Sequence, residues 1–484
     1  MVSFILYDLI FLVLFTLGVV LFLYNRRHNL HRQGLLYLYK TKVGIKFIEW
    51  TSRKFPRTLY YLQYVVVFSG FILMISITYL IIKFSIFYIS SPSAAKALKV
   101  PVLLPLVPYI PEIFNLDFLP PFYFTYWIVI LAIVAIPHEF AHGIFARLNK
   151  IKILSTGFGF LGPFLAAFVE PDENTMNKRD KFPQMAILAS GTFANIVFTV
   201  IFALIFWLFF VLSFHPAGLI FNSYASVNMP ISAVSSINGI PVSDKAEILG
   251  LLNESSEFTE IKIKNGNAND GPNSESENEL AFFVITNNLK IVLENDFDRF
   301  PAIIDSPAFK AKLSGAISEV DGIALTSFEE LGAILRNHKP GDVVSITTIG
   351  DKDERKDNRI ELGELDGKAF LGIGIASQNR EGLLGVVYDF IADIKDPFVY
   401  YESPLGNFGL FIYHMLWWTI LISISVALVN MLPLGIFDGG RFFMLTILGI
   451  TGSKKVANIA FKFSTYLFLI LIAAMMIKWL FIFV

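Results

Sequence analysis

Residues Phe122 to Leu148 read FYFTYWIVILAIVAIPHEFAHGIFARL, an apolar run that carries two histidines and one glutamate near its C-terminal end. A helix that crosses the hydrocarbon core of a bilayer needs about 20 predominantly apolar residues. This stretch is therefore long enough to span a membrane. Ionisable side chains inside a membrane are costly and usually mark a functional site. The stretch thus predicts a membrane helix that carries chemistry.

Comparable apolar runs occur along the rest of the chain. They are Phe4 to Tyr24, Tyr61 to Ile82, Met185 to Phe214, Phe408 to Leu432 and Val456 to Val484. Of the 484 residues, 55% are hydrophobic and 16% charged, whereas soluble domains have about 45–50% apolar and about 25% charged residues. We expect a polytopic α-helical membrane protein with six transmembrane helices. The first run has its basic residues after it, so we expect a retained anchor rather than a cleaved signal peptide.

Charge and cysteine content exclude several classes of protein and of site. The 39 basic and 40 acidic residues give a net charge of -1, so the attraction on which nucleic-acid binding depends is missing, and we expect no nucleic-acid partner. The chain has no cysteine. Disulfides, thiolate nucleophiles and cysteine metal sites are therefore excluded, and any bound metal must be held by histidine and carboxylate side chains.

The distribution of basic residues predicts the topology. Residues 25–58 contain nine basic residues and one acid, whereas residues 89–121 contain two basic residues. Cytoplasmic loops carry an excess of Lys and Arg, so the first loop is predicted to be cytoplasmic, together with residues 149–181 and 441–455. Both termini and the polar insert 215–407 then face outward, most simply across the cell membrane. The basic loop is also suited to contact with anionic lipid.

The polar insert contains a weak internal repeat. Residues 231–253 read ISAVSSINGIPVSDKAEILGLLN, and residues 315–337 read GAISEVDGIALTSFEELGAILRN. Each copy has a short apolar run, an Asn-Gly or Asp-Gly turn, another apolar pair and an amphipathic helical stretch. We expect an extracytoplasmic α+β insert, with a possible tandem of modules at about 222–300 and 301–380. Residues 265–279, between the copies, are expected to be disordered.

The predicted organisation has five parts. Residues 1–121 contain two N-terminal transmembrane helices and the basic loop. The membrane core has two halves, residues 122–214 and 408–455, and the insert, residues 215–407, lies between them in the sequence. Residues 456–484 form a C-terminal transmembrane helix.

The histidines of the opening stretch form an H-E-x-x-H motif. Residues four apart share one face of a helix, so His138 and His142 can present two imidazole nitrogens to one zinc ion. Glu139 then lies beside the open coordination position, where it can act as a general base. A structural alternative, two histidines satisfied inside a helix bundle, leaves three ionisable groups within five residues of a membrane helix unexplained.

A third protein ligand is needed, and Asp438 is the best candidate. It ends the stretch NMLPLGIFD (Asn430 to Asp438) and precedes Gly439 and Gly440. A straight helix from Phe408 would carry Asp438 about 45 Å, well beyond a hydrocarbon core of about 30 Å. We therefore expect the chain to break at Pro433 to Gly435 and to turn back into the bundle.

The paired motifs H-E-x-x-H and N-x-x-P-x-x-x-x-D-G resemble those of the site-2 proteases, which are intramembrane zinc metalloproteases. The resemblance covers the third to fifth spans and the insert, and is greatest to archaeal and bacterial members with six spans. It implies that His138, His142 and Asp438 bind Zn2+ and that Glu139 activates the attacking water. It also implies hydrolysis of peptide bonds within or near transmembrane segments of substrate proteins, in contact with the lipid bilayer.

The resemblance extends to three further features. Residues 318–323 are similar to the strand-turn-strand of PDZ domains in this family, whereas the first copy of the repeat departs from that pattern. Residues 157–169 (GFGFLGPFLAAFV) are too short for a span. In the family a β-hairpin here offers an edge to the substrate, and an ordinary packed loop is the alternative. Asn195 and Asn430 can bind substrate backbone, steady an oxyanion, or simply form interhelical contacts.

Three other functions remain open at this stage. A membrane-anchored metalloprotease that cuts outside the bilayer is the nearest. A zinc transporter also places His and Asp in membrane helices, but has no need of Glu139. A catalytically idle scaffold leaves the complete H-E-x-x-H motif unexplained. The sequence assigns neither the substrate protein nor the oligomeric state.

Overall fold

The computed structural model divides into two compact units, Met1–Leu212 with Asn407–Val484, and Ser213–Gly406. The residues that it describes are 4–33, 36–90, 106–114, 116, 119–161, 164–252, 256–264, 279–294, 297–350, 354–375, 392 and 395–480.

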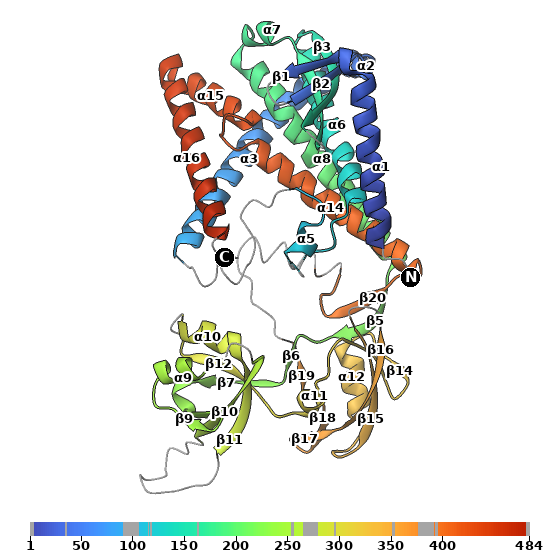
Figure 1. Cartoon of the computed structure of the whole chain (residues 1–484), viewed down its shortest axis with the longest axis vertical. Coiled ribbons are helices and arrows are strands. Elements are labelled where there is room, and N and C mark those ends of the chain that lie inside the picture. The colour runs from blue at the N-terminus through green and yellow to red at the C-terminus, as the bar shows by residue number, and fades with distance from the viewer. Residues whose placement is uncertain are drawn as a thin grey trace. The chain divides into compact units, whose positions relative to one another are not determined.

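The first unit is a helix bundle. Among the described residues, six helices are long and apolar enough to cross a membrane, which confirms the predicted polytopic α-helical fold. They are α1 (Phe4–Asn25), α3 (Pro56–Ser90), α6 (Phe124–Leu148), α8 (Lys181–Ser213), α14 (Gly406–Asn430) and α16 (Lys454–Leu480), all drawn in Figure 1.

Two predictions differ most from the structure. Helix α3 begins at Pro56 and extends to Ser90, beyond the predicted run 61–82, because polar residues at a helix end cost little where they leave the bilayer. The loop predicted at 441–455 is wrong, since α15 (Asp438–Thr451) occupies most of it. Phe442 and Leu445 of this helix are buried, and Gly452 ends it with a left-handed φ of 67°.

A small sheet lies at one end of the bundle. The basic segment predicted as a loop forms β1 (Leu30–Gln33), β2 (Leu36–Thr41) and α2 (Ile45–Lys54). After α6, β3 (Ile153–Leu161) and β4 (Phe164–Pro171) form a hairpin, followed by α7 (Glu173–Asn177). In the described part the strand order is β1-β2-β3-β4, with antiparallel pairs. Figure 1 shows α2 and α7 beside this sheet.

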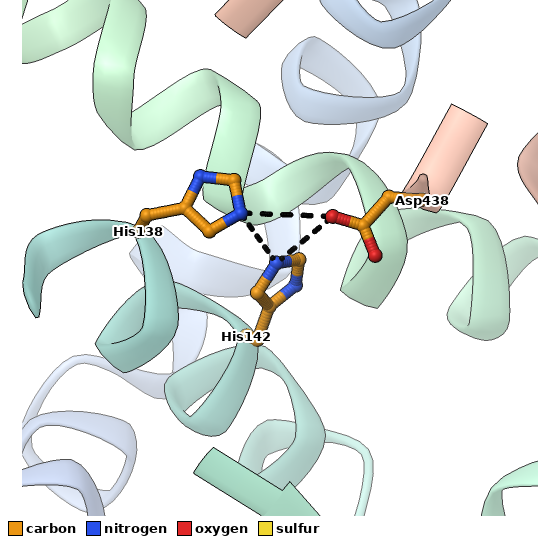
Figure 2. A group of neighbouring side chains, drawn as sticks. All are labelled: His138, His142 and Asp438. Atoms are coloured by element: carbon orange, nitrogen blue, oxygen red, sulfur yellow. Dashed lines mark hydrogen bonds and ion pairs between the residues drawn. The ribbon is translucent and has the colours of Figure 1, made fainter. Parts of the chain in front are cut away.

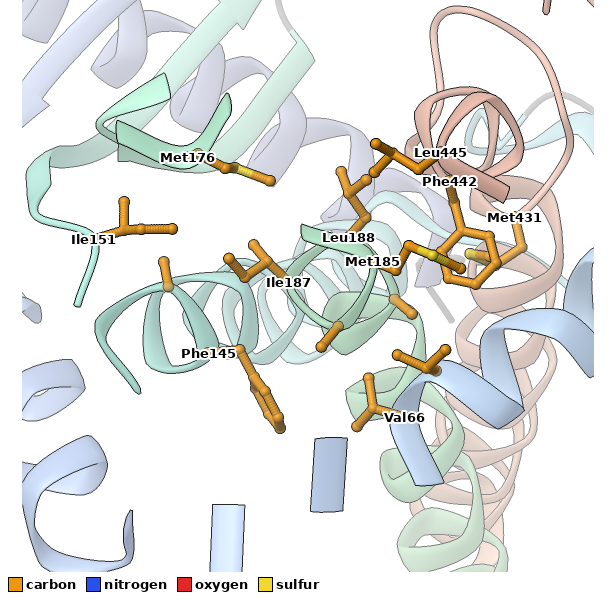
Figure 3. Packing of buried hydrophobic residues seen from close by; sticks show 14 of the residues in the cluster. Val66, Phe145, Ile151, Met176, Met185, Ile187, Leu188, Met431, Phe442 and Leu445 are labelled. Atoms are coloured by element: carbon orange, nitrogen blue, oxygen red, sulfur yellow. The ribbon is translucent and has the colours of Figure 1, made fainter. Parts of the chain in front are cut away.

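A buried apolar cluster holds the helices together near this end. It joins side chains of α3, α6, α8 and α15, including those of Val66, Phe145, Leu188 and Phe442 (Figure 3). Close approach of α3 depends on Gly70, because a Cβ there would lie 2.9 Å from the Cβ of Ala189 and 3.1 Å from the Phe442 ring. Small residues permit such contacts between membrane helices. This packing fixes the positions of α6, α8 and α15 relative to one another.

Helix α1 is joined to α6 by Asp8, an acid for which the sequence predicted no role. Its side chain is buried and accepts hydrogen bonds from the backbone N–H groups of Phe124 at 2.7 Å and Thr125 at 2.9 Å. The hydroxyls of Tyr109 and Thr125 also donate to it. The first N–H groups of a helix have no partner within the helix. Asp8 therefore caps α6 from a neighbouring helix.

The second unit contains two six-stranded sheets in its described part, with strand orders β7-β12-β11-β10-β8-β9 and β16-β15-β13-β5-β20, the second having β14 beside β13. The first sheet comprises β7 (Ser226–Pro230), β8 (Val234–Ile237), β9 (Ile240–Pro241), β10 (Phe258–Lys264), β11 (Glu279–Ile285) and β12 (Arg299–Ile303), with helices α9 (Lys245–Leu251) and α10 (Thr286–Glu294). The second comprises β5 (His215–Ile220), β13 (Ala316–Val320), β14 (Ile323–Ala324), β15 (Val343–Ile349), β16 (Arg355–Glu361) and β20 (Val399–Glu402), with α11 (Pro307–Lys310) and α12 (Phe328–Leu335).

The remaining described elements are short strands, α5 (Ile110–Ile113) in the first unit, and the 3-10 helices η1 (Arg27–Asn29) and η2 (Ile231–Ala233). Strand β17 (Gly363–Leu365) pairs with β18 (Lys368–Phe370), and β19 (Ile373–Gly374) pairs with β6 (Ser223–Tyr224).

The internal repeat appears as a shared element order. In the first copy β8, a turn, β9 and α9 follow one another, and in the second copy β13, a turn, β14 and α12 do so. Asn238 and Gly239 have φ values of 48° and 80°, and Asp321 and Gly322 have 50° and 77°. Positive φ at both central residues is the requirement of a type I′ turn. The loop predicted as disordered lies outside the described residues, except that Glu279 begins β11.

Candidate active site

The two motif histidines and Asp438 converge on one point. His138 and His142 lie one turn apart on α6, and their Nε2 atoms are 3.1 Å from each other. The Oδ2 atom of Asp438 lies 3.6 Å from Nε2 of His138 and 3.3 Å from Nε2 of His142. Figure 2 shows the three side chains pointing toward one another. They form a group that can hold a metal ion.

Asp438 reaches this point because the chain turns sharply after α14. The helix ends at Asn430, and α15 begins at Asp438, so the predicted break in the Pro433 region is confirmed. The turn requires glycine at two positions. A Cβ on Gly439 would lie 2.3 Å from the backbone oxygen of Met431, and a Cβ on Gly440 would lie 2.4 Å from that of Leu434. Both distances are far shorter than a van der Waals contact.

Gly191 of α8 faces the same point, a role that the sequence did not predict. A Cβ at this position would lie 2.4 Å from Nε2 of His142 and 2.6 Å from Nε2 of His138. Any side chain would therefore occupy the space in front of the imidazole nitrogens. The sequence does contain one sign of this role: small residues (Ala189, Ser190 and Thr192) flank Gly191, and small residues mark close contacts between membrane helices.

The second ring nitrogen of each histidine also has a partner. The Nδ1–H of His142 donates to the backbone oxygen of Ile187 at 2.7 Å, which leaves the Nε2 lone pair for a ligand. Nδ1 of His138 lies 3.1 Å from the amide Nδ2 of Asn195. Within the described residues, the buried Oδ1 of Asn195 has no hydrogen-bond partner. Turning the amide by 180° would let Oδ1 of Asn195 accept a hydrogen bond from the Nδ1–H of His138, so that each of these two atoms has a partner.

Glu139 is held by the hairpin rather than by the metal ligands. Its Oε2 accepts a hydrogen bond from the backbone N–H of Val169 in β4 at 2.9 Å. In the described part of the chain β4 pairs with β3 alone, so its other edge carries no strand. Val169 presents its N–H to that edge. Because backbone groups alternate along an antiparallel strand, Leu165 and Ala167 present theirs to the same edge.

Two apolar cavities border the site. One, of about 190 Å³, lies between α6 and the hairpin and is lined by residues that include Ala135, Ile136, Leu165 and Ala167. The other, of about 360 Å³, is lined by Trp418, Val426 and Asn430 of α14 and by Phe437, the neighbour of Asp438. The structure thus places Asn195 against a motif histidine and Asn430 in the wall of a cavity.

The donor set suits a tetrahedral metal ion. Zinc bonds of about 2.0–2.1 Å hold tetrahedral ligand atoms about 3.3 Å apart, and the three separations here are 3.1, 3.3 and 3.6 Å. Two imidazoles and one carboxylate are common ligands of such sites. Gly191 leaves space directly in front of them. Three protein donors leave a fourth position for water or substrate, as in catalytic rather than structural sites.

Comparison with known proteins agrees with this geometry. The model of peptidase family M50 matches residues 126–472, a region that includes both motifs, the hairpin and the insert. A search of curated proteins found no match. The matched region covers more than half of the chain, and the family is one of membrane metallopeptidases of the site-2 protease type. The protein is therefore a multi-pass membrane protein that belongs to peptidase family M50.

Proposed function

We propose that the chain is an intramembrane zinc protease that hydrolyses peptide bonds within or near transmembrane segments of substrate proteins. The observation that carries the proposal is the convergence of His138, His142 and Asp438 beside Glu139, within a bundle of membrane helices. His138, His142 and Asp438 are the proposed zinc ligands. Imidazole and carboxylate donors at these separations favour zinc in a tetrahedral site with one open position.

Glu139 is the proposed general base. When bound, zinc supplies a Lewis acid that activates water and polarises the scissile carbonyl. Glu139 accepts the proton of the attacking water and returns it to the leaving amine nitrogen. The hydrogen bond from the Val169 N–H to Oε2 restrains the carboxylate, so that its other oxygen can turn toward the water. Asn195 has an indirect role in this proposal: it orients the His138 ring and does not contact the substrate.

The substrate must leave its helical conformation before it is cut. A carbonyl in a helix is already engaged by the N–H four residues later, which opposes nucleophilic attack. The open edge of β4 offers replacement hydrogen bonds from Ala167 and Leu165, two and four residues before Val169, which donates to Glu139. An extended substrate segment added to this edge by β-augmentation would pass the site. The cavity beside Asn430 and Phe437 would receive an apolar substrate side chain.

The topology proposed for the active protein follows the lysine and arginine bias. The active site lies toward the cytoplasmic side of the cell membrane, and the termini and insert lie outside. The PDZ-like modules of the insert would restrict access to substrates that have already been trimmed outside the membrane. Water would reach the metal through a polar path from the cytoplasmic side.

The test uses the purified full-length protein and its Glu139→Gln variant, both with bound zinc measured. Each is incubated with a membrane-spanning peptide, and the cut is mapped by mass spectrometry. We expect cleavage within or near the spanning segment, and a loss of about 10²–10⁴-fold in the variant. Equal cleavage by both proteins contradicts the mechanism. Cuts confined to loops favour the protease that acts outside the bilayer, and zinc flux that survives Glu139→Gln favours a transporter.

A further inference from the structure

Helix α2 lies beside the membrane surface. It ends at Lys54, and α3, a membrane-spanning helix, begins at Pro56. The side chains of Tyr60, Tyr61 and Tyr64, in the first turns of α3, are exposed. Tyrosine and tryptophan gather at the headgroup level of a bilayer, so these three residues mark the interface. α2 is therefore held within one or two turns of the headgroups.

One face of α2 is fixed on the helix that carries the H-E-x-x-H motif. Ile48 is fully buried, and its Cδ1 atom lies so close to Gly143 of α6 that a Cβ there would be only 2.8 Å away. Glu49 forms an ion pair with Arg147 of α6, with 3.1 Å between Oε1 and a guanidinium nitrogen. These contacts determine which face of α2 remains outward.

The outward face combines basic and aromatic side chains. We call it the α2 outer face, and it consists of Lys46, Phe47, Trp50, Arg53 and Lys54, all exposed. The Phe47 and Trp50 rings stack with centroids 6.0 Å apart, and Nζ of Lys54 lies 4.6 Å from the Trp50 centroid. Phe47 lies at the edge of this face, because its ring also contacts that of Phe140 on α6. Arg53 lies 3.9 Å from the carboxylate of Glu49 on the same helix, whereas within the described part of the chain Lys46 and Lys54 have no carboxylate partner.

We propose that the α2 outer face binds the anionic phospholipid headgroups of the surrounding leaflet. Half-exposed aromatic rings between cations are costly in water, yet suit the boundary between headgroups and acyl chains. Lysine and arginine stems can lie along apolar surface while their charges reach lipid phosphates. The anchoring on α6 leaves this charge on the outward side of α2, next to the start of a membrane helix, where anionic lipid supplies the complementary charge. Such lipid binding requires only the membrane fold and not the proposed protease activity.

The absence of cysteine allows a single label to report on this face. Val43, just before α2, is 78% exposed and does not belong to the α2 outer face. A fluorophore on Val43→Cys in the full-length protein is reconstituted in vesicles of phosphatidylcholine and phosphatidylglycerol. A headgroup-proximal quencher is carried by either the phosphatidylglycerol or the phosphatidylcholine. The ratio of the two quenching efficiencies measures local enrichment of anionic lipid.

The variants separate lipid binding from general charge. Each Lys or Arg near an anionic surface strengthens its binding to anionic lipid by about fivefold. We therefore expect a quenching ratio severalfold above one for the parent protein. The ratio should fall to about one in the variant Lys46→Gln/Arg53→Gln/Lys54→Gln. The control Lys339→Gln/Lys356→Gln/Lys368→Gln removes exposed charges from the insert and should keep the parent ratio. A parent ratio of one, as expected if the face docks a protein instead, overturns the proposal. So does an unchanged ratio in the first triple variant.

Discussion

Oε2 of Glu139 accepts a hydrogen bond of 2.9 Å from the backbone N–H of Val169, which joins the H-E-x-x-H helix to the edge strand β4. The carboxylate is thus aligned by the same strand edge that is proposed to receive the substrate. A change in the hairpin is therefore expected to alter both proton transfer and substrate placement.

Val169→Pro removes the N–H that holds Glu139. Proline is tolerated at an edge strand where the N–H points away from the sheet, so the hairpin should remain. We expect kcat on a membrane-spanning peptide to fall by about tenfold or more, since a positioned base contributes about 10²–10⁴-fold, with unchanged bound metal. Val169→Ala keeps the N–H and should retain parent activity. Similar kcat values for Pro and Ala at this position would refute the alignment role.

Asn195→Ala removes the partner of the His138 Nδ1 atom. Loss of such a partner typically lowers metal affinity by about 10–100-fold, which competition with a chromophoric chelator measures directly. Asn195→Asp retains an oxygen acceptor and should recover much of the affinity. If Asn195 were only an interhelical contact, both variants would bind metal as the parent does.

Gly191→Ala places a methyl group 2.4 Å from Nε2 of His142, so the ligands or α8 must shift. We expect loss of stoichiometric metal, measured by elemental analysis of the purified protein. Gly449→Ala in α15 is the matched control, because nothing lies within 4 Å of its added Cβ. Full metal occupancy in Gly191→Ala would show that the site is more open than the packing implies.

Glu170 in β4 predicts a pH dependence of stability. Lys40 of β2 donates to both of its carboxylate oxygens, at 2.8 and 2.7 Å. This bond, followed by that from Ser155, lowers the pKa of Glu170. A carboxyl group whose pKa is lowered by folding stabilises the folded state at pH values above its pKa in the unfolded chain, about 4.3. This stabilisation is lost as the pH falls through the pKa of the folded state.

The pair is about one-third exposed, so Glu170→Gln should cost at most about 1 kcal/mol at neutral pH. Thermal unfolding in detergent should show a Tm deficit that is constant between pH 6 and 7, on the plateau well above about 4.3, and that shrinks below about pH 4. A deficit that grows on acidification would contradict the assigned sign.

Asp8→Ala removes the cap that α1 provides to α6. N-cap removal costs about 0.5–2 kcal/mol, and here the docking of α1 is lost with it, so we expect a lower Tm and faster proteolysis of the α1–β1 connection. Thr16→Val is the control on the same helix. It removes a hydrogen bond within α1 only, because among the described contacts Thr16 donates to Leu12 of α1. Equal effects of the two substitutions would contradict the capping role.

Local patterns allowed the sequence to predict much of this protein. Six apolar runs are membrane helices because a bilayer demands uninterrupted apolar length. His138 and His142 share a face because their spacing of four matches one helical turn. The internal repeat gave the strand-turn-strand-helix order because Asn-Gly and Asp-Gly favour tight turns of that type. For the basic segment before α3 the sequence predicted a loop, because β2 is held by β3, a strand more than a hundred residues later.

The sequence by itself therefore determined the membrane fold, the two motif histidines and the candidate third ligand. Only the tertiary structure decided which groups surround them: Val169 beside Glu139, Asn195 beside His138, Gly191 in front of both imidazoles, and Asp8 on the first turn of α6. Periodicity fixes which residues share a face of one helix, because helical geometry is local. Contacts between helices depend instead on how glycines and buried side chains let them pack, and no single segment encodes that arrangement.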